Sequence, residues 1–197
     1  MALAVTYLTN DLVVVAAYEN GYTCVWRRGT STSDWTSAYA SKAHNQPVLS
    51  LDIAKAHGLY FTSAADALIA SHPLIAEGAA TEPIKQAQTK HSGQQALTVR
   101  SDGKILATAG WDGRVRVYSA KTLRELAVLK WHKEGCYALA FADLNPAVVE
   151  NETNASHVSD TRLFNPTVNE KRSVQAQTTH WLAAGAKDGK VSLWDIY

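Results

Sequence analysis

The composition of the chain is that of a folded globular protein. It has 197 residues, of which 46% are hydrophobic and 19% are charged, and this excludes an intrinsically disordered chain. Lys and Arg number 19 against 18 Asp and Glu, and the resulting net charge of +1 argues against a dedicated nucleic-acid binder.

Short strands separated by turns predict an all-β chain with about 15 strands, in four groups. In residues 1–42 we expect strands at Ala2–Leu8, Leu12–Ala17, Tyr22–Arg27 and Trp35–Ala40. In residues 43–90 they are Pro47–Ile53, Leu59–Ser63, Ala67–Ser71 and Ile84–Thr89. In residues 91–130 they are Gln95–Arg100, Ile105–Ala109, Arg114–Tyr118 and Thr122–Leu129. In residues 131–197 they are Gly135–Ala142, His180–Gly185 and Lys190–Ile196.

Two segments complete this list. Met1–Leu8 lacks a basic region and predicts a strand instead of a signal peptide, and no apolar run approaches the roughly 20 residues of a membrane span. Residues 143–177 are polar, contain two Asn-Pro pairs and show no apolar period, which predicts a mobile insertion loop.

A turn residue marks each repeat of the chain. Asn20, Asp66 and Asp112 follow one another at intervals of 46 residues, and Asp188 follows 76 residues later because of the insertion. Six residues after three of these marks stands an aromatic residue, Trp26, Tyr118 or Trp194, whereas Asp66 is followed at this offset by His72. Asp-Gly or Asn-Gly between short β-rich runs is typical of hairpins.

A histidine precedes three of these units. His44 lies 22 residues before Asp66, His91 lies 21 residues before Asp112, and His132 precedes Asp188 across the insertion. With a Thr on the intervening strand, this pattern resembles the WD repeat of β-propellers. The predicted fold is therefore a partial propeller, with three blades and three strands of a fourth.

The resemblance implies a hydrogen-bonded structural network that satisfies polar groups between blades. Its expected members are His44, Thr62, Asp66, His91, Thr108, Asp112, Tyr118, His132, Asp188, Trp194, Asn20 and Trp26. A structural role is preferred over metal binding or acid–base catalysis because the histidine spacing follows the repeat. Replacement of His91 or Asp112 by alanine is accordingly expected to unfold the protein.

Enzymatic and cofactor motifs are missing from the sequence. It contains no phosphate-binding glycine loop, no His-Glu-x-x-His and no Cys-x-x-Cys. Cys24 and Cys136 are too few for a disulfide framework or a thiolate zinc site, and we expect buried thiols in a reducing, intracellular compartment. We expect no catalytic residue, cofactor, metal ion or small-molecule substrate, and a propeller enzyme with scattered residues is the remote alternative.

Protein binding is the function that the sequence favours. Loops that carry the turn Asp and the preceding His lie on one face of a propeller, where exposed aromatic residues beside charges bind partners. The candidate docking residues are Tyr18, Trp111, Trp131, Lys133 and Lys187. The alternative for Trp111 and Trp131 is packing between blades.

The third and fourth units have a closer resemblance. The segments 107–119, 126–141 and 183–194 resemble the C-terminal half of the fungal ASTRA-associated protein 1 family, whose animal relative is a G-protein β-subunit-like protein. Full members of that family carry about seven blades, so we expect this chain to be about half of a domain.

The resemblance implies a non-enzymatic scaffold subunit of the nuclear ASTRA complex. Its implied partners are ASTRA subunits, including the Tel2–Tti1–Tti2 co-chaperone, with no membrane and no direct nucleic-acid contact. The implied processes are chromatin remodelling and maturation of phosphatidylinositol-3-kinase-related kinases, in the nucleus and, as a second location, the cytoplasm. A generic WD-repeat adaptor, such as a substrate receptor of a ubiquitin ligase, is the alternative.

Overall fold

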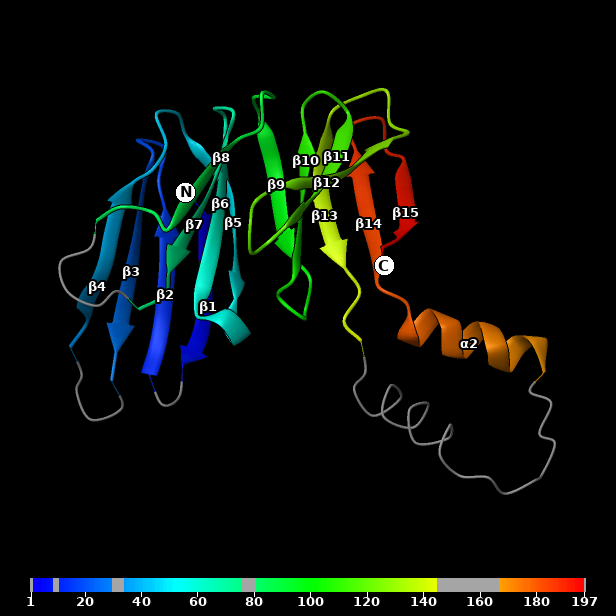
Figure 1. Cartoon of the computed structure of the whole chain (residues 1–197), viewed down its shortest axis with the longest axis horizontal. Coiled ribbons are helices and arrows are strands. Elements are labelled where there is room, and N and C mark those ends of the chain that lie inside the picture. Colours follow the sequence, from blue (N-terminus) through cyan, green and yellow to red (C-terminus); the bar gives the residue numbers. More distant parts are fainter. Residues whose placement is uncertain (1, 9–10, 30–33, 76–80, 145–166, 197) are drawn as a thin grey trace, which may run out of the picture.

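A computed structural model of the chain describes residues 2–8, 11–29, 34–75, 81–144 and 167–196. In these residues 15 strands form four antiparallel sheets, each built from consecutive strands (Figure 1). The first sheet contains β1 (Ala2–Leu8), β2 (Asp11–Ala17), β3 (Tyr22–Arg28) and β4 (Thr36–Lys42). The second contains β5 (Val48–Ala54), β6 (Leu59–Ala64), β7 (Leu68–Pro73) and β8 (Lys85–Gln88). The third contains β9 (Gln94–Val99), β10 (Ile105–Gly110), β11 (Arg114–Ser119) and β12 (Glu125–Lys130). The fourth contains β13 (Cys136–Phe141), β14 (Trp181–Ala186) and β15 (Val191–Asp195).

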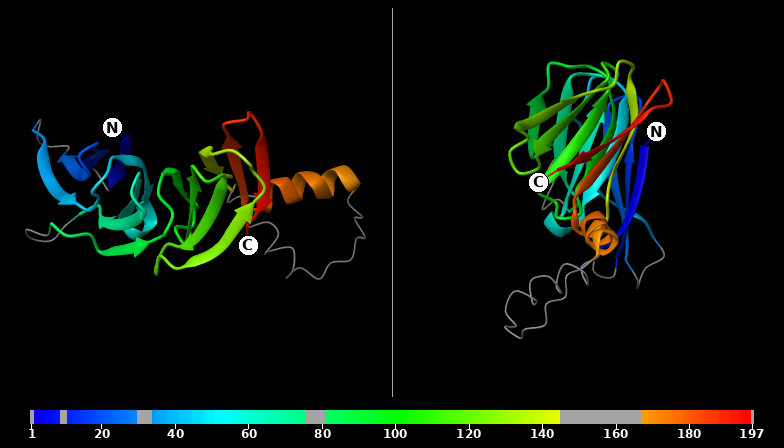
Figure 2. Two further views of the ribbon diagram at one scale, coloured as in Figure 1. Left: turned by 90° about the horizontal axis from the view of Figure 1, so that it is seen from above. Right: turned by 90° about the vertical axis from the view of Figure 1, so that its right-hand side faces the viewer.

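The sheets follow one another along a curved path, as the view from above in Figure 2 shows. The first strand of each sheet contacts the first strand of the next, from β1 through β5 and β9 to β13. Three clusters of buried apolar side chains fill the spaces between successive sheets. The predicted all-β partial propeller, with three four-stranded sheets and three strands of a fourth, is therefore confirmed.

Strand boundaries differ from the sequence prediction by a few residues. The largest difference is at β12, which begins at Glu125 and not at Thr122. The backbone N–H of Ser119 donates to the carbonyl of Arg124, and Leu123 adopts a positive φ of 57°. These contacts close a turn over residues that the alternating pattern had assigned to a strand.

Helical structure in the described residues comprises a 3-10 turn, η1 (Lys55–His57), and one α-helix, α2 (Val168–Thr178). The loop predicted for residues 143–177 is therefore wrong where α2 runs, and residues 145–166 lie outside the described part. The α2 sequence is rich in Glu, Lys, Arg and Gln, which favour a helix but leave no apolar stripe to announce it. Neither described helix is long and apolar enough to span a membrane.

Candidate functional site

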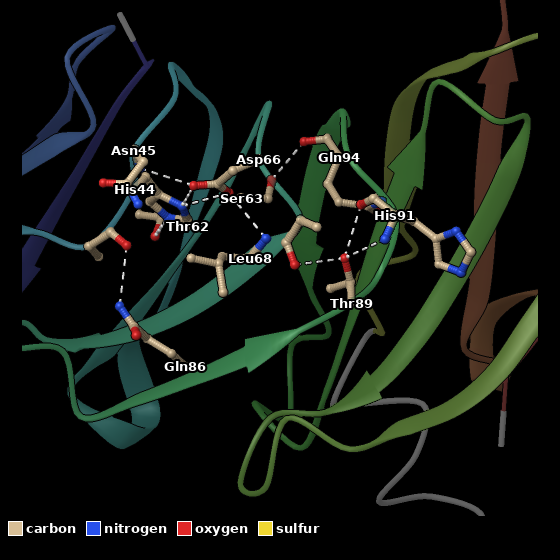
Figure 3. Close-up of polar contacts among 12 residues, drawn as sticks. His44, Asn45, Thr62, Ser63, Asp66, Leu68, Gln86, Thr89, His91 and Gln94 are labelled. Carbon is tan, nitrogen blue, oxygen red and sulfur yellow. Dashed lines mark hydrogen bonds and ion pairs between the residues drawn. The ribbon is translucent and has the colours of Figure 1, made fainter.

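The second sheet carries a complete polar network at its core (Figure 3). Nδ1 of His44 lies 3.1 Å from Oδ1 of Asp66, and its Nε2 lies 2.8 Å from the Thr62 hydroxyl. A carboxylate can only accept, so Nδ1 of His44 donates to Asp66. His44 and Thr62 are buried, and backbone N–H groups of Asn45 and Leu68 also donate to Asp66. The predicted contacts among His44, Thr62 and Asp66 are present.

His72 extends this network, and the sequence analysis did not include it. Its Nε2 lies 3.0 Å from the Thr62 hydroxyl, which can donate to one imidazole and accept from the other. Its Nδ1 lies 3.1 Å from the hydroxyl of Tyr39, which donates to the Glu82 carbonyl. His72 holds the place of the aromatic residue six positions after the turn Asp, so the repeat spacing itself could have identified it.

Burial has opposite consequences for the two titratable ends of this network. Burial raises the pKa of Asp66, but the hydrogen bonds from His44, Leu68 and Asn45 outweigh it and the pKa is lowered overall. Burial, with a smaller contribution from His44, lowers the pKa of His72 to about 3. His72 is therefore neutral and Asp66 ionised near neutral pH.

The third sheet satisfies the same positions with different side chains. Thr108 donates to the side-chain carbonyl of Gln94 at 2.7 Å, and Gln94 is fully buried. The amide of Gln94 in turn donates to the backbone carbonyl of His91. Gln94 thus holds the place predicted for His91.

The prediction that His91 joins the network is wrong. Its ring is 44% exposed, lies 3.8 Å from the Asp112 carboxylate and points away from the Gln94 contacts (Figure 3). The physical reason is a register difference of one residue, because the interval to the turn Asp is 21 for His91 and 22 for His44. Lys90, with a positive φ of 61°, occupies the position equivalent to His44.

Asp112 has a different partner from the one predicted. The guanidinium of Arg116, which is 1% exposed, donates to Asp112 from both Nη atoms, one of them at 3.1 Å. Burial raises the pKa of Asp112, but the Arg116 contacts and the backbone N–H of Arg114 lower it overall. Tyr118 is buried, as expected for its position, and burial raises its pKa to about 12.

The fourth sheet rearranges the network again. Nε1 of Trp194 donates to the Ser192 hydroxyl at 2.8 Å, and this hydroxyl lies 2.8 Å from Nε2 of His132. Ser192 is paired across the strands with Ala184, where the repeat pattern lacked its hydroxyl. The predicted His132–Asp188 contact is not formed in the described residues, since Asp188 pairs with Lys190 at 2.9 Å.

The first sheet has no comparable network in the described residues. Asn20 accepts from the backbone N–H of Tyr22 and so shapes the turn, as predicted. Trp26 is 38% exposed, and its predicted network role is wrong, because no hydroxyl stands at Ala16. Thr23 instead reaches the hydroxyl of Tyr60 in the second sheet at 3.1 Å.

Most of the candidate docking residues lie in adjoining loops at the upper end of the third and fourth sheets in Figure 1. Trp111 is 46% and Trp131 is 53% exposed, and Lys133 and Lys187 are exposed as well. Gly135 joins their loops: it lies against the Trp111 carbonyl, and its own carbonyl accepts from the backbone N–H of Lys187. We call Trp111, Trp131, Lys133, Tyr137 and Lys187 the upper surface.

Two further contacts shape the upper surface. The Trp111 ring covers Gly93, where a Cβ atom would come within 2.2 Å of the ring, and its Nε1 donates to Gln95. Trp131, His132, Lys133, Asp188 and Lys190 line a shallow cavity of about 190 Å³. Tyr18 does not belong to this surface, because it is half-buried in the β2–β3 turn of the first sheet.

Chemical sites of other kinds were sought in the same residues. In the described ranges no three His, Cys, Asp or Glu side chains are grouped so that they could hold a metal ion. Cys24 and Cys136 are free thiols, and burial raises the pKa of both, that of Cys136 to about 11.

Comparison with known proteins agrees with this class of fold. The family described as WD domain, G-beta repeat matches residues 84–119 and 173–195. The computationally designed Ika4 protein superimposes with a TM-score of 0.62, at 19% identity, over 100% of this chain and 90% of Ika4. The molecule is thus a WD-repeat protein with a partial β-propeller fold.

Relatives of known name define its family more closely. ASTRA-associated protein 1 of Aspergillus flavus is 46% identical over 100% of this chain and 51% of its own length. The protein of the same name from Schizosaccharomyces pombe is 46% identical over 72% of this chain and 42% of its own. The mouse guanine nucleotide-binding protein subunit beta-like protein 1 is 27% identical over 94% of this chain and 44% of its own. The chain belongs to the ASTRA-associated protein 1 family and spans about half the length of the first of these relatives.

Proposed function

We propose that the chain is a non-enzymatic scaffold subunit of the ASTRA complex that acts in the nucleus. In this proposal it takes part in chromatin remodelling and in co-chaperone-assisted maturation of phosphatidylinositol-3-kinase-related kinases, with the Tel2–Tti1–Tti2 co-chaperone among its partners. The family membership of the chain supports the complex, and the upper surface supports the mode of action.

The exposure of two tryptophans in adjoining loops is the observation that carries this proposal. Large aromatic side chains that remain in contact with water mark binding surfaces, and tryptophan is enriched among residues that dominate binding energy. Trp111 is held in place by Gly93 and Gln95, so its ring is ordered before a partner arrives. Ordered anchors lose little conformational entropy on binding, which favours stable scaffold contacts.

Co-purification from the cells that express the chain tests the proposal. The tagged chain should recover ASTRA and co-chaperone subunits, and a Trp111→Ala/Trp131→Ala variant should lose most of them. Trp35→Ala is the matched control, because Trp35 is 43% exposed beside β4 of the first sheet. Unchanged recovery by the double variant would refute docking at the upper surface.

The identity of the recovered proteins separates the alternatives. Co-chaperone subunits support the ASTRA scaffold, whereas a cullin adaptor without them supports a substrate receptor of a ubiquitin ligase. Quantitative mass spectrometry of both samples against an untagged control makes this distinction.

A further inference from the structure

A second concave site lies at the end of the molecule opposite the upper surface. It is a cavity of about 640 Å³ between the second and third sheets, within the size range of ligand sites. Leu59, Phe61 and Ala120 form its apolar wall, and His57, Lys104 and Lys121 are its basic lining residues. The η1 turn and the β9–β10 and β11–β12 turns supply these residues, at the lower end of Figure 1.

The apolar wall is part of a rigid core. Phe61 is fully buried in the cluster that joins the second and third sheets, and Leu59 packs against that cluster. Gly103 lets the His57 ring lie close to the β9–β10 turn, because a Cβ atom there would be 2.4 Å from the ring. The cavity therefore has a fixed apolar interior without rearrangement of the strands.

The charges around the cavity are not balanced from within the chain. None of the residues that line it is acidic, and in the described residues neither Lys104 nor Lys121 forms an ion pair. Asp102, next to the cavity, is paired with Arg100 at 2.7 Å. The ammonium group of Lys85 donates to the Lys121 carbonyl and adds a further positive charge nearby. A positively charged rim over an apolar wall is complementary to an anionic ligand that also carries an apolar group.

We propose that this cavity, which we call the lower cavity, binds an acidic peptide segment of a partner protein. A large apolar side chain of the segment contacts Leu59 and Phe61, and carboxylates on either side of it pair with Lys104 and Lys121. The exposed lysines let the rest of the segment continue into solvent. A nucleic-acid backbone would pair with the lysines but would leave the apolar wall uncovered.

Fluorescence anisotropy of the 197-residue chain with a designed probe tests the lower cavity. The probe is a short labelled peptide in which glutamates flank a central leucine–phenylalanine pair. We expect saturable binding that weakens about tenfold or more in Lys104→Glu/Lys121→Glu, since the two attractive pairs become repulsive. Replacement of the probe's leucine–phenylalanine pair by serines, or of its glutamates by glutamines, should also weaken binding.

Lys133→Glu is the matched control, because it makes the same charge change on an exposed lysine of the upper surface. It should leave the affinity for the probe unchanged, and the thermal melting curves of all variants should coincide because the exchanged side chains are exposed. Absence of saturable binding would overturn the proposal. Equal weakening by Lys133→Glu, or equal binding of the serine probe, would show nonspecific attraction and would also overturn it.

Discussion

The second and third sheets fill the same repeat positions with different chemistry. In the second sheet the buried pair His44 and Thr62 is linked to Asp66 and continues to His72. In the third sheet Thr108 binds Gln94, whereas Asp112 binds the buried guanidinium of Arg116. One connected network has become two separate pairs.

The difference shows what the repeat preserves. Each buried hydroxyl needs a partner, because an unsatisfied buried polar group costs about 1–3 kcal/mol. An imidazole and an amide can both supply that partner, so the residue type changes while hydrogen bonding is kept. The upper turns differ in the same way: Pro47 and Ala65 of the second sheet correspond to Gly93 and Trp111 of the third, where the glycine makes room for the indole ring.

The largest expected effect contrasts the two histidines. His44→Ala removes two buried hydrogen bonds and leaves a cavity, so it should reduce the free energy of unfolding by about 4 kcal/mol. His91→Ala should change it by less than about 0.5 kcal/mol, because the ring is exposed and its bonded carbonyl belongs to the backbone. Urea denaturation followed by circular dichroism measures both. A large loss in His91→Ala would restore the network that the repeat pattern predicted.

The next contrast removes one hydroxyl from each sheet without changing side-chain shape. Thr62→Val leaves the Nε2 atoms of two buried imidazoles without their shared partner, and should cost about 3 kcal/mol. Thr108→Val leaves only the Gln94 side-chain carbonyl unpaired, and should cost about 1 kcal/mol. Equal losses in the same denaturation experiment would contradict a connected network in the second sheet.

Acidification should destabilise the second sheet through His72. Its pKa falls from the ordinary value to about 3 on folding, so the unfolded chain takes up the proton first and stability is lost as pH falls from about 6.5 toward 3. Between pH 7 and pH 5 the expected loss is about 2 kcal/mol. The lowered pKa of Asp66 acts in the same direction but only below its ordinary value, at lower pH. Denaturation of His72→Gln at both pH values is the check, and an unchanged pH dependence would exclude His72 as the cause.

The smallest effect on stability should come from the upper surface. Trp111→Ala removes a ring that is 46% exposed and a hydrogen bond to Gln95, and should cost less than about 1 kcal/mol. Thermal melting measures it, with Trp35→Ala as the control. Loss of several kcal/mol would instead mean that Trp111 is a packing residue of the third sheet.

The sequence predicted much of the fold because strand and turn signals are local. Asp-Gly turns and alternating strands located all 15 strands, and the 46-residue interval located the network of the second sheet. The same interval misplaced His91, since a register shift of one residue in a connecting loop leaves no local signal. Helix α2 was missed because its polar sequence carries no periodic pattern.

The sequence by itself determined the repeat, the all-β class and the positions at which a buried polar group must stand. These follow from spacing, because each repeat forms its own sheet. Only the tertiary structure decided which side chains satisfy those groups. Gln94, Arg116 and Ser192 became partners of Thr108, Asp112 and Trp194 through contacts between strands, whose distances depend on register and packing. The tertiary structure also separated the upper surface from the lower cavity, because each gathers residues from neighbouring turns at one end of the sheets.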